Sequence, residues 1–248
     1  MDDAEKRNWT YSEYLNLREL LELQGEDRGI SSDEMHFIIV HQTFELWFKQ
    51  IIRELSEARN ILSQENVPEN DIPVAVDHLC RTTEIFRLMA NQWTVLETLT
   101  PQGFLSFRDG LGTASGFESY QMREFEILIG LENSDRLGGM DPLDSFRKMA
   151  ENGEGDSSIL AHLEKMKELP SLRESLMNWI ERTPIMGSIY GSEGDEELVS
   201  AYVDAHLEAH EDICNSASGS SEMMAERMRA VHEGAKSFLR PEGRISRA

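Results

Sequence analysis

The sequence of 248 residues is poor in cysteine and contains no long hydrophobic run. Its two cysteines, Cys80 and Cys214, belong to no CxxC or CxxCH motif, which argues against a disulfide scaffold, a zinc finger and ordinary c-type haem attachment. The charged N-terminus lacks the apolar stretch of a signal peptide, and no apolar run has the length of a transmembrane helix. These absences predict a cytoplasmic protein with reduced thiols and no membrane partner.

Basic side chains are also scarce. Lysine and arginine number 24 against 46 aspartates and glutamates, which gives a formal net charge of −22. Such a charge would repel the phosphates of nucleic acids and of anionic membranes, so we expect neither as a partner. Hydrophobic residues make up 40% of the chain, which is enough for a sizeable core and excludes a disordered acidic tail.

What the sequence does contain is helical periodicity. Apolar residues recur every three or four positions behind an N-cap sequence at 31–34, which predicts a long helix over 32–64. A second long helix is predicted over 72–99. Shorter helices are predicted over 10–24, 101–110, 117–130, 141–151, 156–168, 170–183, 195–214 and 221–239. No strand pattern occurs, so we predict an all-α helical bundle that forms a single domain over residues 1–248.

Two polar side chains stand among apolar residues. His41 lies within the apolar stripe of the first long helix, where a neutral imidazole can make a hydrogen bond inside an apolar cavity or serve only as a core residue. Arg108 follows Phe104 and precedes a glycine-rich turn. Its guanidinium can bind a carboxylate ligand through two parallel bonds, or it can pair with Asp109 or Glu118.

Other candidates carry weaker signals. Ser115 and Gly116 precede a predicted helix, where backbone N–H groups and a hydroxyl can hold a negative group, or where Ser115 can act only as a cap. Tyr11 and Tyr14 share one helix face, a spacing typical of core packing. The sequence has no GxGxxG, Walker, HExxH or GxSxG motif, so no single motif decides the function.

Taken together, three blocks resemble a known family. They are YSEYLNLRELLELQ from Tyr11, DEMHFIIVHQTFELWFK from Asp33, and the segment from Trp93 to Gly130 that contains LETLTP and FRDGLGTASGFESYQMR. Over residues 9–131 the chain resembles tryptophan 2,3-dioxygenase. The resemblance implies an all-α homotetramer, a dimer of dimers, that binds haem b. It also implies that O2 opens the indole C2–C3 bond of L-tryptophan to give N-formylkynurenine, in the kynurenine pathway.

The resemblance also implies roles for individual residues. His41 corresponds to the distal histidine that hydrogen-bonds the indole N–H or the bound oxygen. Phe37 and Phe104 correspond to walls of the indole pocket, and Arg108 to the clamp on the substrate carboxylate. Phe104 stands where many family members have a tyrosine, so one hydroxyl is missing here.

Further roles follow for the haem and for a neighbouring subunit. Ser115 and Gly116 correspond to residues beside the haem and the bound substrate, and Trp93 to a haem-pocket residue. The residues of the segment that completes a neighbouring subunit's pocket are Tyr11, Tyr14 and Leu15.

The resemblance fades after residue 183, so that 184–248 is divergent. The W-R-x-R-H segment that carries the proximal haem ligand of the family, and the G-T-G-G-S-S-G block that follows it, are not found. We predict His232 as the proximal ligand, because an arginine precedes it by three residues as in the family segment. Alternatively His210 ligates the iron while Cys214 forms a thioether, or the ligand lies outside this chain.

Two other functions stay open at this point. The first is a haem monooxygenase of the same fold that acts on a substituted tryptophan or a related indole. The missing block and Phe104 motivate this alternative. The second is a haem-free subunit that binds a ligand or takes part in assembly.

Overall fold

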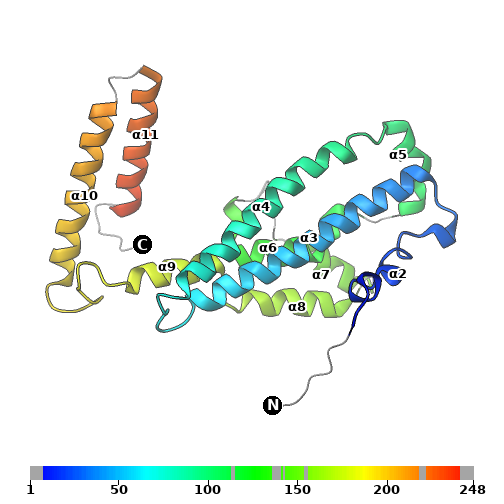
Figure 1. Cartoon of the computed structure of the whole chain (residues 1–248), viewed down its shortest axis with the longest axis horizontal. Helices are drawn as coiled ribbons and strands as arrows, with labels where there is room; N and C mark the ends of the chain where they lie inside the picture. The colour runs from blue at the N-terminus through cyan, green and yellow to red at the C-terminus, as the bar shows by residue number, and fades with distance from the viewer. Residues whose placement is uncertain are drawn as a thin grey trace, which may run out of the picture. The chain divides into compact units, whose positions relative to one another are not determined.

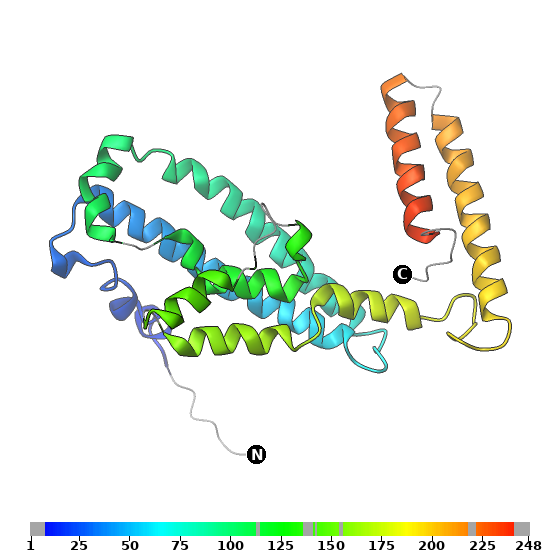
Figure 2. The same cartoon turned by 180° about the vertical axis from the view of Figure 1, so that it is seen from behind.

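The computed structural model describes residues 8–112, 115–135, 141, 143–153, 156–217 and 222–240. Regular structure in these residues is helical apart from an isolated antiparallel bridge between Ile185 and Ser188 (Figures 1 and 2). The predicted all-α fold is therefore confirmed. Within the same residues, no helix combines the length and the apolar character needed to cross a bilayer.

The chain divides into two compact units. The first unit comprises Met1–Ser56 and Val76–Leu169, and the second comprises Glu57–Ala75 and Pro170–Ala248. The division falls inside the two long helices, α3 (Ser32–Leu62) and α4 (Ile72–Leu96). A single domain over residues 1–248 stays a prediction.

In the first unit, α3 and α4 run antiparallel, side by side (Figures 1 and 2). Polar side chains bridge them, because Gln92 Nε2 donates to the Val40 carbonyl at 3.1 Å and His36 Nε2 lies 3.1 Å from the Val95 carbonyl oxygen. The first turn of α3 is capped by Ser31, whose hydroxyl accepts from the Glu34 N–H. Both helices lie within three residues of their predicted ends.

The same unit contains α5 (Pro101–Phe107), α6 (Tyr120–Ile129), α7 (Asp144–Glu151) and α8 (Ser157–Lys167). Around α8, the buried core consists of Leu143, Phe146 and Leu163, with Ile127, Ile159 and Leu160 packed against them. Burial of apolar side chains at this contact between α6, α7 and α8 supplies the main stabilisation of this part of the fold.

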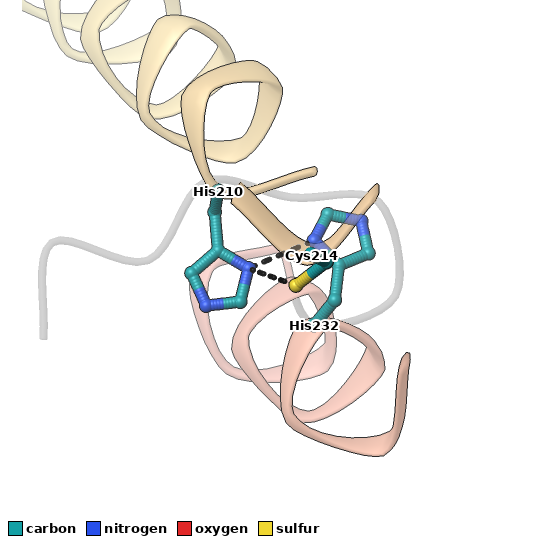
Figure 3. A group of neighbouring side chains, drawn as sticks. All are labelled: His210, Cys214 and His232. Atoms are coloured by element: carbon teal, nitrogen blue, oxygen red, sulfur yellow. Dashed lines mark hydrogen bonds between the residues drawn. The ribbon is translucent and has the colours of Figure 1, made fainter. Parts of the chain in front are cut away.

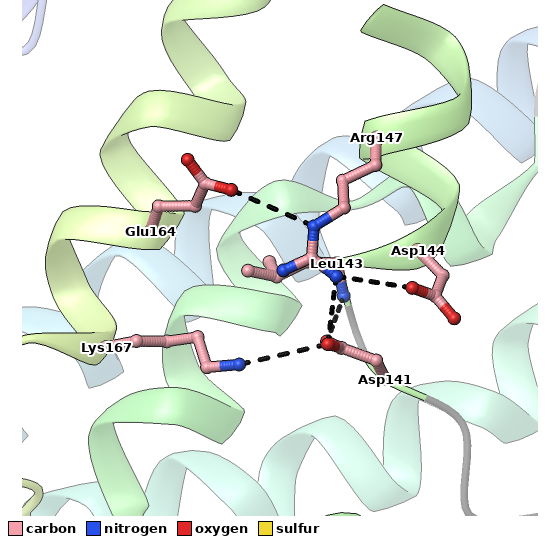
Figure 4. Close-up of polar contacts among 6 residues, drawn as sticks. All are labelled: Asp141, Leu143, Asp144, Arg147, Glu164 and Lys167. Atoms are coloured by element: carbon pink, nitrogen blue, oxygen red, sulfur yellow. Dashed lines mark hydrogen bonds and ion pairs between the residues drawn. The ribbon is translucent and has the colours of Figure 1, made fainter. Parts of the chain in front are cut away.

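An ion-pair network lies beside this core (Figure 4). Arg147 Nη1 lies 3.0 Å from Asp141 Oδ2, and the Leu143 N–H donates to the other Asp141 oxygen at 2.9 Å. Partial burial alone would raise the pKa of Asp141, but the bonds from Leu143 and Arg147 outweigh it and lower the pKa below its ordinary value. The remaining members of the network are Asp144, Glu164 and Lys167.

The N-terminal helix predicted over 10–24 is wrong. The structure has two single turns instead, α1 (Tyr11–Tyr14) and α2 (Leu17–Leu20), separated by Asn16 in the left-handed conformation with φ of 48°. Asparagine tolerates this conformation better than most residues, and one such residue interrupts the helical hydrogen-bond ladder.

The second unit contains α9 (Leu172–Arg182), α10 (Asp195–Ala217) and α11 (Glu222–Leu239). The last two helices pack against each other as a hairpin (Figures 1 and 2). Their bounds lie close to the predictions.

Glu54 is a buried carboxylate on α3 in the first unit, only 4% exposed. His78 Nδ1 and Arg81 Nη1, both on α4, lie 2.6 Å and 2.7 Å from its Oε2, and Gln50 donates to its other oxygen. Burial raises the pKa of Glu54, but these hydrogen bonds together lower it below the ordinary 4.5. The charged carboxylate therefore stabilises the contact between the two long helices.

Glu54→Gln is expected to lower the free energy of unfolding by about 1–2 kcal/mol at neutral pH, because the hydrogen bonds of His78, Arg81 and Gln50 lose their charged acceptor. A lowered folded-state pKa gives stability above the ordinary pKa that is lost as the pH falls through the folded-state value. The difference between wild type and variant in urea unfolding should therefore shrink in acid. The exposed Glu84→Gln is the matched control, with an effect under about 0.5 kcal/mol. If Glu54→Gln lowered the free energy of unfolding equally at neutral and at acid pH, the stabilising role of the charged carboxylate would be contradicted.

Candidate active site

His41 lies in the middle of α3 and is half-buried. Its Nδ1 is 2.8 Å from the Phe37 carbonyl oxygen, and the two rings lie with their centroids 4.0 Å apart. Because a carbonyl oxygen only accepts, Nδ1 carries the proton of the neutral ring, and Nε2 is left with the lone pair. The arrangement makes His41 Nε2 a hydrogen-bond acceptor.

An aromatic wall adjoins this imidazole. The Phe37 ring centroid lies 5.9 Å from that of Phe104 and 5.5 Å from that of Phe107, and these two α5 rings meet edge to face. The structure thus brings together the predicted residues His41, Phe37 and Phe104. Sequence reasoning missed Phe107, although its position three residues after Phe104 places it on the same helix face.

The start of α5 explains how this wall forms. Thr100 Oγ1 accepts from the Gly103 N–H at 3.0 Å, and Pro101 occupies the first turn, where its missing N–H costs nothing. A Cβ added at Gly103 would collide with Asp33 Oδ2. The glycine therefore lets α5 approach the first turn of α3, and Phe104 then lies beside Phe37.

A mainly apolar groove of about 780 Å³ runs along the same face of α3. His41 and Phe37 line it, together with five residues of the N-terminal segment: Leu20, Leu21, Leu23, Gln24 and Glu26. Gln42 fastens that segment to α3, because its Nε2 donates to the Leu23 carbonyl at 2.8 Å. Among the residues that line the groove in the described chain, Arg108, Phe104 and Ser115 do not occur. Of the predicted site residues, the groove is therefore lined by His41 and Phe37.

Arg108 begins the 3-10 turn η2 (Arg108–Leu111), directly after α5. It is half-buried, and its Nη1 donates to the Gly112 carbonyl oxygen at 3.1 Å. This partner differs from Asp109 and Glu118, the two pairings considered from the sequence. A carbonyl oxygen carries no net charge, so this bond leaves the guanidinium able to accept a carboxylate partner. Arg108 comes four residues after Phe104, a spacing that places the two residues on the same helix face.

Ser115 and Gly116 are exposed at the 3-10 turn η3 (Gly116–Glu118). The Ser115 carbonyl accepts from the Glu118 N–H at 2.9 Å, which begins this turn. Thr113 and Ala114, in the same predicted glycine-rich turn, lie outside the described residues. The cap of α6 is Ser119, whose hydroxyl accepts from the Met122 N–H at 3.1 Å, whereas Ser115 directly precedes η3.

Four other predicted site residues are surface-exposed. Trp93 on α4 is 54% exposed, and its ring lies 5.3 Å from that of Phe44 on α3. Tyr11, Tyr14 and Leu15 are exposed in the single chain, which shows that core packing is not the reason for the tyrosine spacing. Exposed aromatic side chains of this kind are available to a second molecule.

The predicted proximal ligand, His232, lies on α11 in the second unit. Its Nδ1 is 3.1 Å from His210 Nδ1 on α10, and Cys214 Sγ is 3.6 Å from the same His210 atom (Figure 3). The histidine thus belongs to a three-residue group that joins two helices. Its assignment as an axial haem ligand stays a prediction, and the group supports a different role, which is argued below.

The fold and the site define an all-α protein with an apolar groove, large enough for a small-molecule ligand, that is lined by an imidazole and one residue of an aromatic wall. The family model described as tryptophan 2,3-dioxygenase matches residues 1–242. The chain belongs to the tryptophan 2,3-dioxygenase family, which is haem-dependent.

Curated relatives agree with this membership. The chain is 41% identical over 189 residues to tryptophan 2,3-dioxygenase 2 of Ralstonia nicotianae, covering 72% of this chain and 50% of the relative. It is 38% identical over 191 residues to tryptophan 2,3-dioxygenase of Sorangium cellulosum (73% and 45%) and 36% identical over 178 residues to that of Anopheles gambiae (70% and 44%). The chain thus spans about half the length of the curated relatives it matches.

The residues around His41 fit the border of a haem pocket. The Nδ1 of this imidazole bonds to a backbone carbonyl beside apolar rings, so its Nε2 can contact either an aromatic ligand or the haem iron.

Proposed function

We propose that the protein is a haem-dependent dioxygenase that inserts both atoms of O2 across the indole C2–C3 bond of L-tryptophan to give N-formylkynurenine. The observation that carries the proposal is the acceptor nitrogen of His41 beside the Phe37–Phe104 wall, in a chain of this family. The function is the first step of tryptophan breakdown through the kynurenine pathway, and we place it in the cytoplasm.

In this function His41 and the aromatic wall orient the indole. The lone pair of His41 Nε2 accepts the indole N–H, which is the only strong donor on the bicyclic ring. Phe37 and Phe104 offer apolar ring surface to the flat indole. Together they fix the plane of the ring and the direction of its N–H.

Arg108 binds the other end of the substrate. The α-carboxylate replaces the Gly112 carbonyl as partner of the guanidinium, since a carboxylate offers two charged oxygens in a geometry that matches the two N–H groups. The site thereby recognises an amino acid and selects against indoles that lack a carboxylate.

Haem b, when bound, supplies the activation of O2. We assign Trp93, Ser115 and Gly116 to its pocket. The chain's own contribution is to hold the indole ring and to exclude water from the apolar groove beside it.

We further propose that the protein works as a homotetramer. The exposure of Tyr11, Tyr14 and Leu15 supports this, because these side chains are free to complete the pocket of a neighbouring copy. The N-terminal segment that carries them is joined to α3 through Gln42.

The function is tested by loading the purified protein with haem b and supplying L-tryptophan under ¹⁸O2. The expected result is a Soret band and N-formylkynurenine that carries both labelled oxygen atoms. A product with a single labelled oxygen would identify a monooxygenase instead. Failure to form a Soret band would favour a haem-free binding subunit and overturn the proposal.

A further inference from the structure

Three potential metal ligands meet where α10 and α11 pack together. His210 and Cys214 lie one turn apart on α10, and His232 comes from α11 (Figure 3). One ligand atom from each side chain, here called the His–Cys–His cluster, lies within 4.8 Å of the other two. The roles proposed above for His41, Phe37, Phe104 and Arg108 do not use this cluster.

Two of the three distances within the cluster are close to those of ligands around one small cation. His210 Nδ1 lies 3.1 Å from His232 Nδ1 and 3.6 Å from Cys214 Sγ. Tetrahedral Zn²⁺ with ordinary bond lengths places two nitrogens about 3.3 Å apart and a nitrogen and a sulfur about 3.6 Å apart. The side chains therefore need little rearrangement to share a cation.

The surroundings also suit a cation. Cys214 is buried, and the two histidines are half-buried and give access from solvent. The Cys214 S–H donates to the Met228 carbonyl oxygen at 3.4 Å, a bond that is given up when the thiol loses its proton to bind a cation. The chain carries a formal charge of −22, which favours cations near its surface. Imidazole nitrogen and thiolate sulfur are preferred by zinc-like cations, whereas Mg²⁺ and Ca²⁺ prefer oxygen.

We propose that the His–Cys–His cluster binds a transition-metal cation of the Zn²⁺ type, with two nitrogens and one sulfur as protein ligands and a fourth position for water. The bound cation joins α10 to α11. Since such a site forms only when the two helices are paired, binding stabilises the hairpin.

This role differs from axial ligation of haem by His232. The Nδ1 atoms of the two histidines lie 3.1 Å apart, which suits one cation shared between them, whereas an axial haem ligand would bind iron through one imidazole nitrogen of a single histidine. The inference concerns residues of α10 and α11 alone, and it assigns His232 to this site instead of to the haem iron.

The test is titration of the metal-stripped full-length protein with Co²⁺ in excess Mg²⁺, which occupies exposed carboxylates. We expect about one Co²⁺ per chain, with the visible bands of a tetrahedral site and a thiolate-to-cobalt charge-transfer band in the near ultraviolet. Added Zn²⁺ should displace Co²⁺ and raise the thermal unfolding temperature.

Single-residue variants test which side chains bind the Co²⁺ ion. Cys214→Ser should abolish the charge-transfer band, and His232→Ala should weaken Co²⁺ binding at least about tenfold. The matched controls are Cys80→Ser, which removes the other, exposed thiol, and His206→Ala, which removes a neighbouring exposed histidine; both should bind as wild type. Circular dichroism checks that each variant keeps its helix content. If Cys214→Ser does not fold, the Co²⁺ affinity of His232→Ala tests the site instead.

Three results would overturn the inference. The first is absence of the charge-transfer band in the wild type, and the second is loss of that band in Cys80→Ser. The third is a haem Soret band that His232→Ala removes from a protein that binds no Co²⁺, which would assign His232 to haem iron. If the dioxygenase assay failed while Co²⁺ still bound, the proposed function would be wrong and the metal site would be supported.

Discussion

Arg108→Leu is expected to weaken the binding of L-tryptophan to the haem-loaded protein at least about tenfold, because two charge-assisted hydrogen bonds to the carboxylate are lost. Leucine retains apolar volume at the end of α5, so the contact between Phe104 and Phe107 should persist. The effect should therefore fall on the ligand's carboxylate and leave the aromatic wall in place.

A comparison of two ligands isolates this effect. Tryptamine keeps the indole and the ammonium group but has no carboxylate, so its affinity should be the same for wild type and Arg108→Leu in a spectroscopic titration. Arg87→Leu, which removes an exposed arginine of α4, is the matched control and should leave both affinities unchanged. Unaltered L-tryptophan affinity in Arg108→Leu would refute the carboxylate clamp.

His41→Ala is expected to lower turnover of L-tryptophan by roughly a hundredfold while haem stays bound. The change removes the acceptor for the indole N–H, so the ring is no longer held in one orientation for reaction with O2. It also removes the ring that packs on Phe37 at 4.0 Å, but the backbone of α3 keeps its own hydrogen bonds.

The methylated substrate 1-methyl-L-tryptophan has no indole N–H and so cannot use His41 Nε2. Wild type and His41→Ala should therefore turn it over at similar, low rates, whereas they differ greatly with L-tryptophan. His206→Ala serves as the control histidine and should behave as wild type with both substrates. Loss of the Soret band in His41→Ala would make His41 an iron ligand and contradict the distal role.

The long helices could be predicted because their determinants are local. The apolar stripe and the Ser31 cap define α3, and Pro101 with the Thr100 cap separates α4 from α5. The N-terminal prediction failed at Asn16, because the pattern of apolar residues does not show that one residue adopts a left-handed conformation.

The site was predictable to the extent that it lies on one helix face or matches the family pattern. The contacts between His41, Phe37 and Phe104 follow the prediction, whereas the partner of Arg108 is a backbone carbonyl that no side-chain pattern reveals. Similarly, the shared face of His210 and Cys214 was predictable from their spacing. Their meeting with His232 depends on how α10 packs on α11, which periodicity does not determine.

The most direct test of the central claim is a crystal structure of the haem-loaded protein with L-tryptophan bound. We predict the indole N–H within hydrogen-bond distance of His41 Nε2, the ring against Phe37 and Phe104, and the carboxylate on the Arg108 guanidinium. A tryptophan molecule bound with its carboxylate away from Arg108, or with its indole away from His41, would contradict the account.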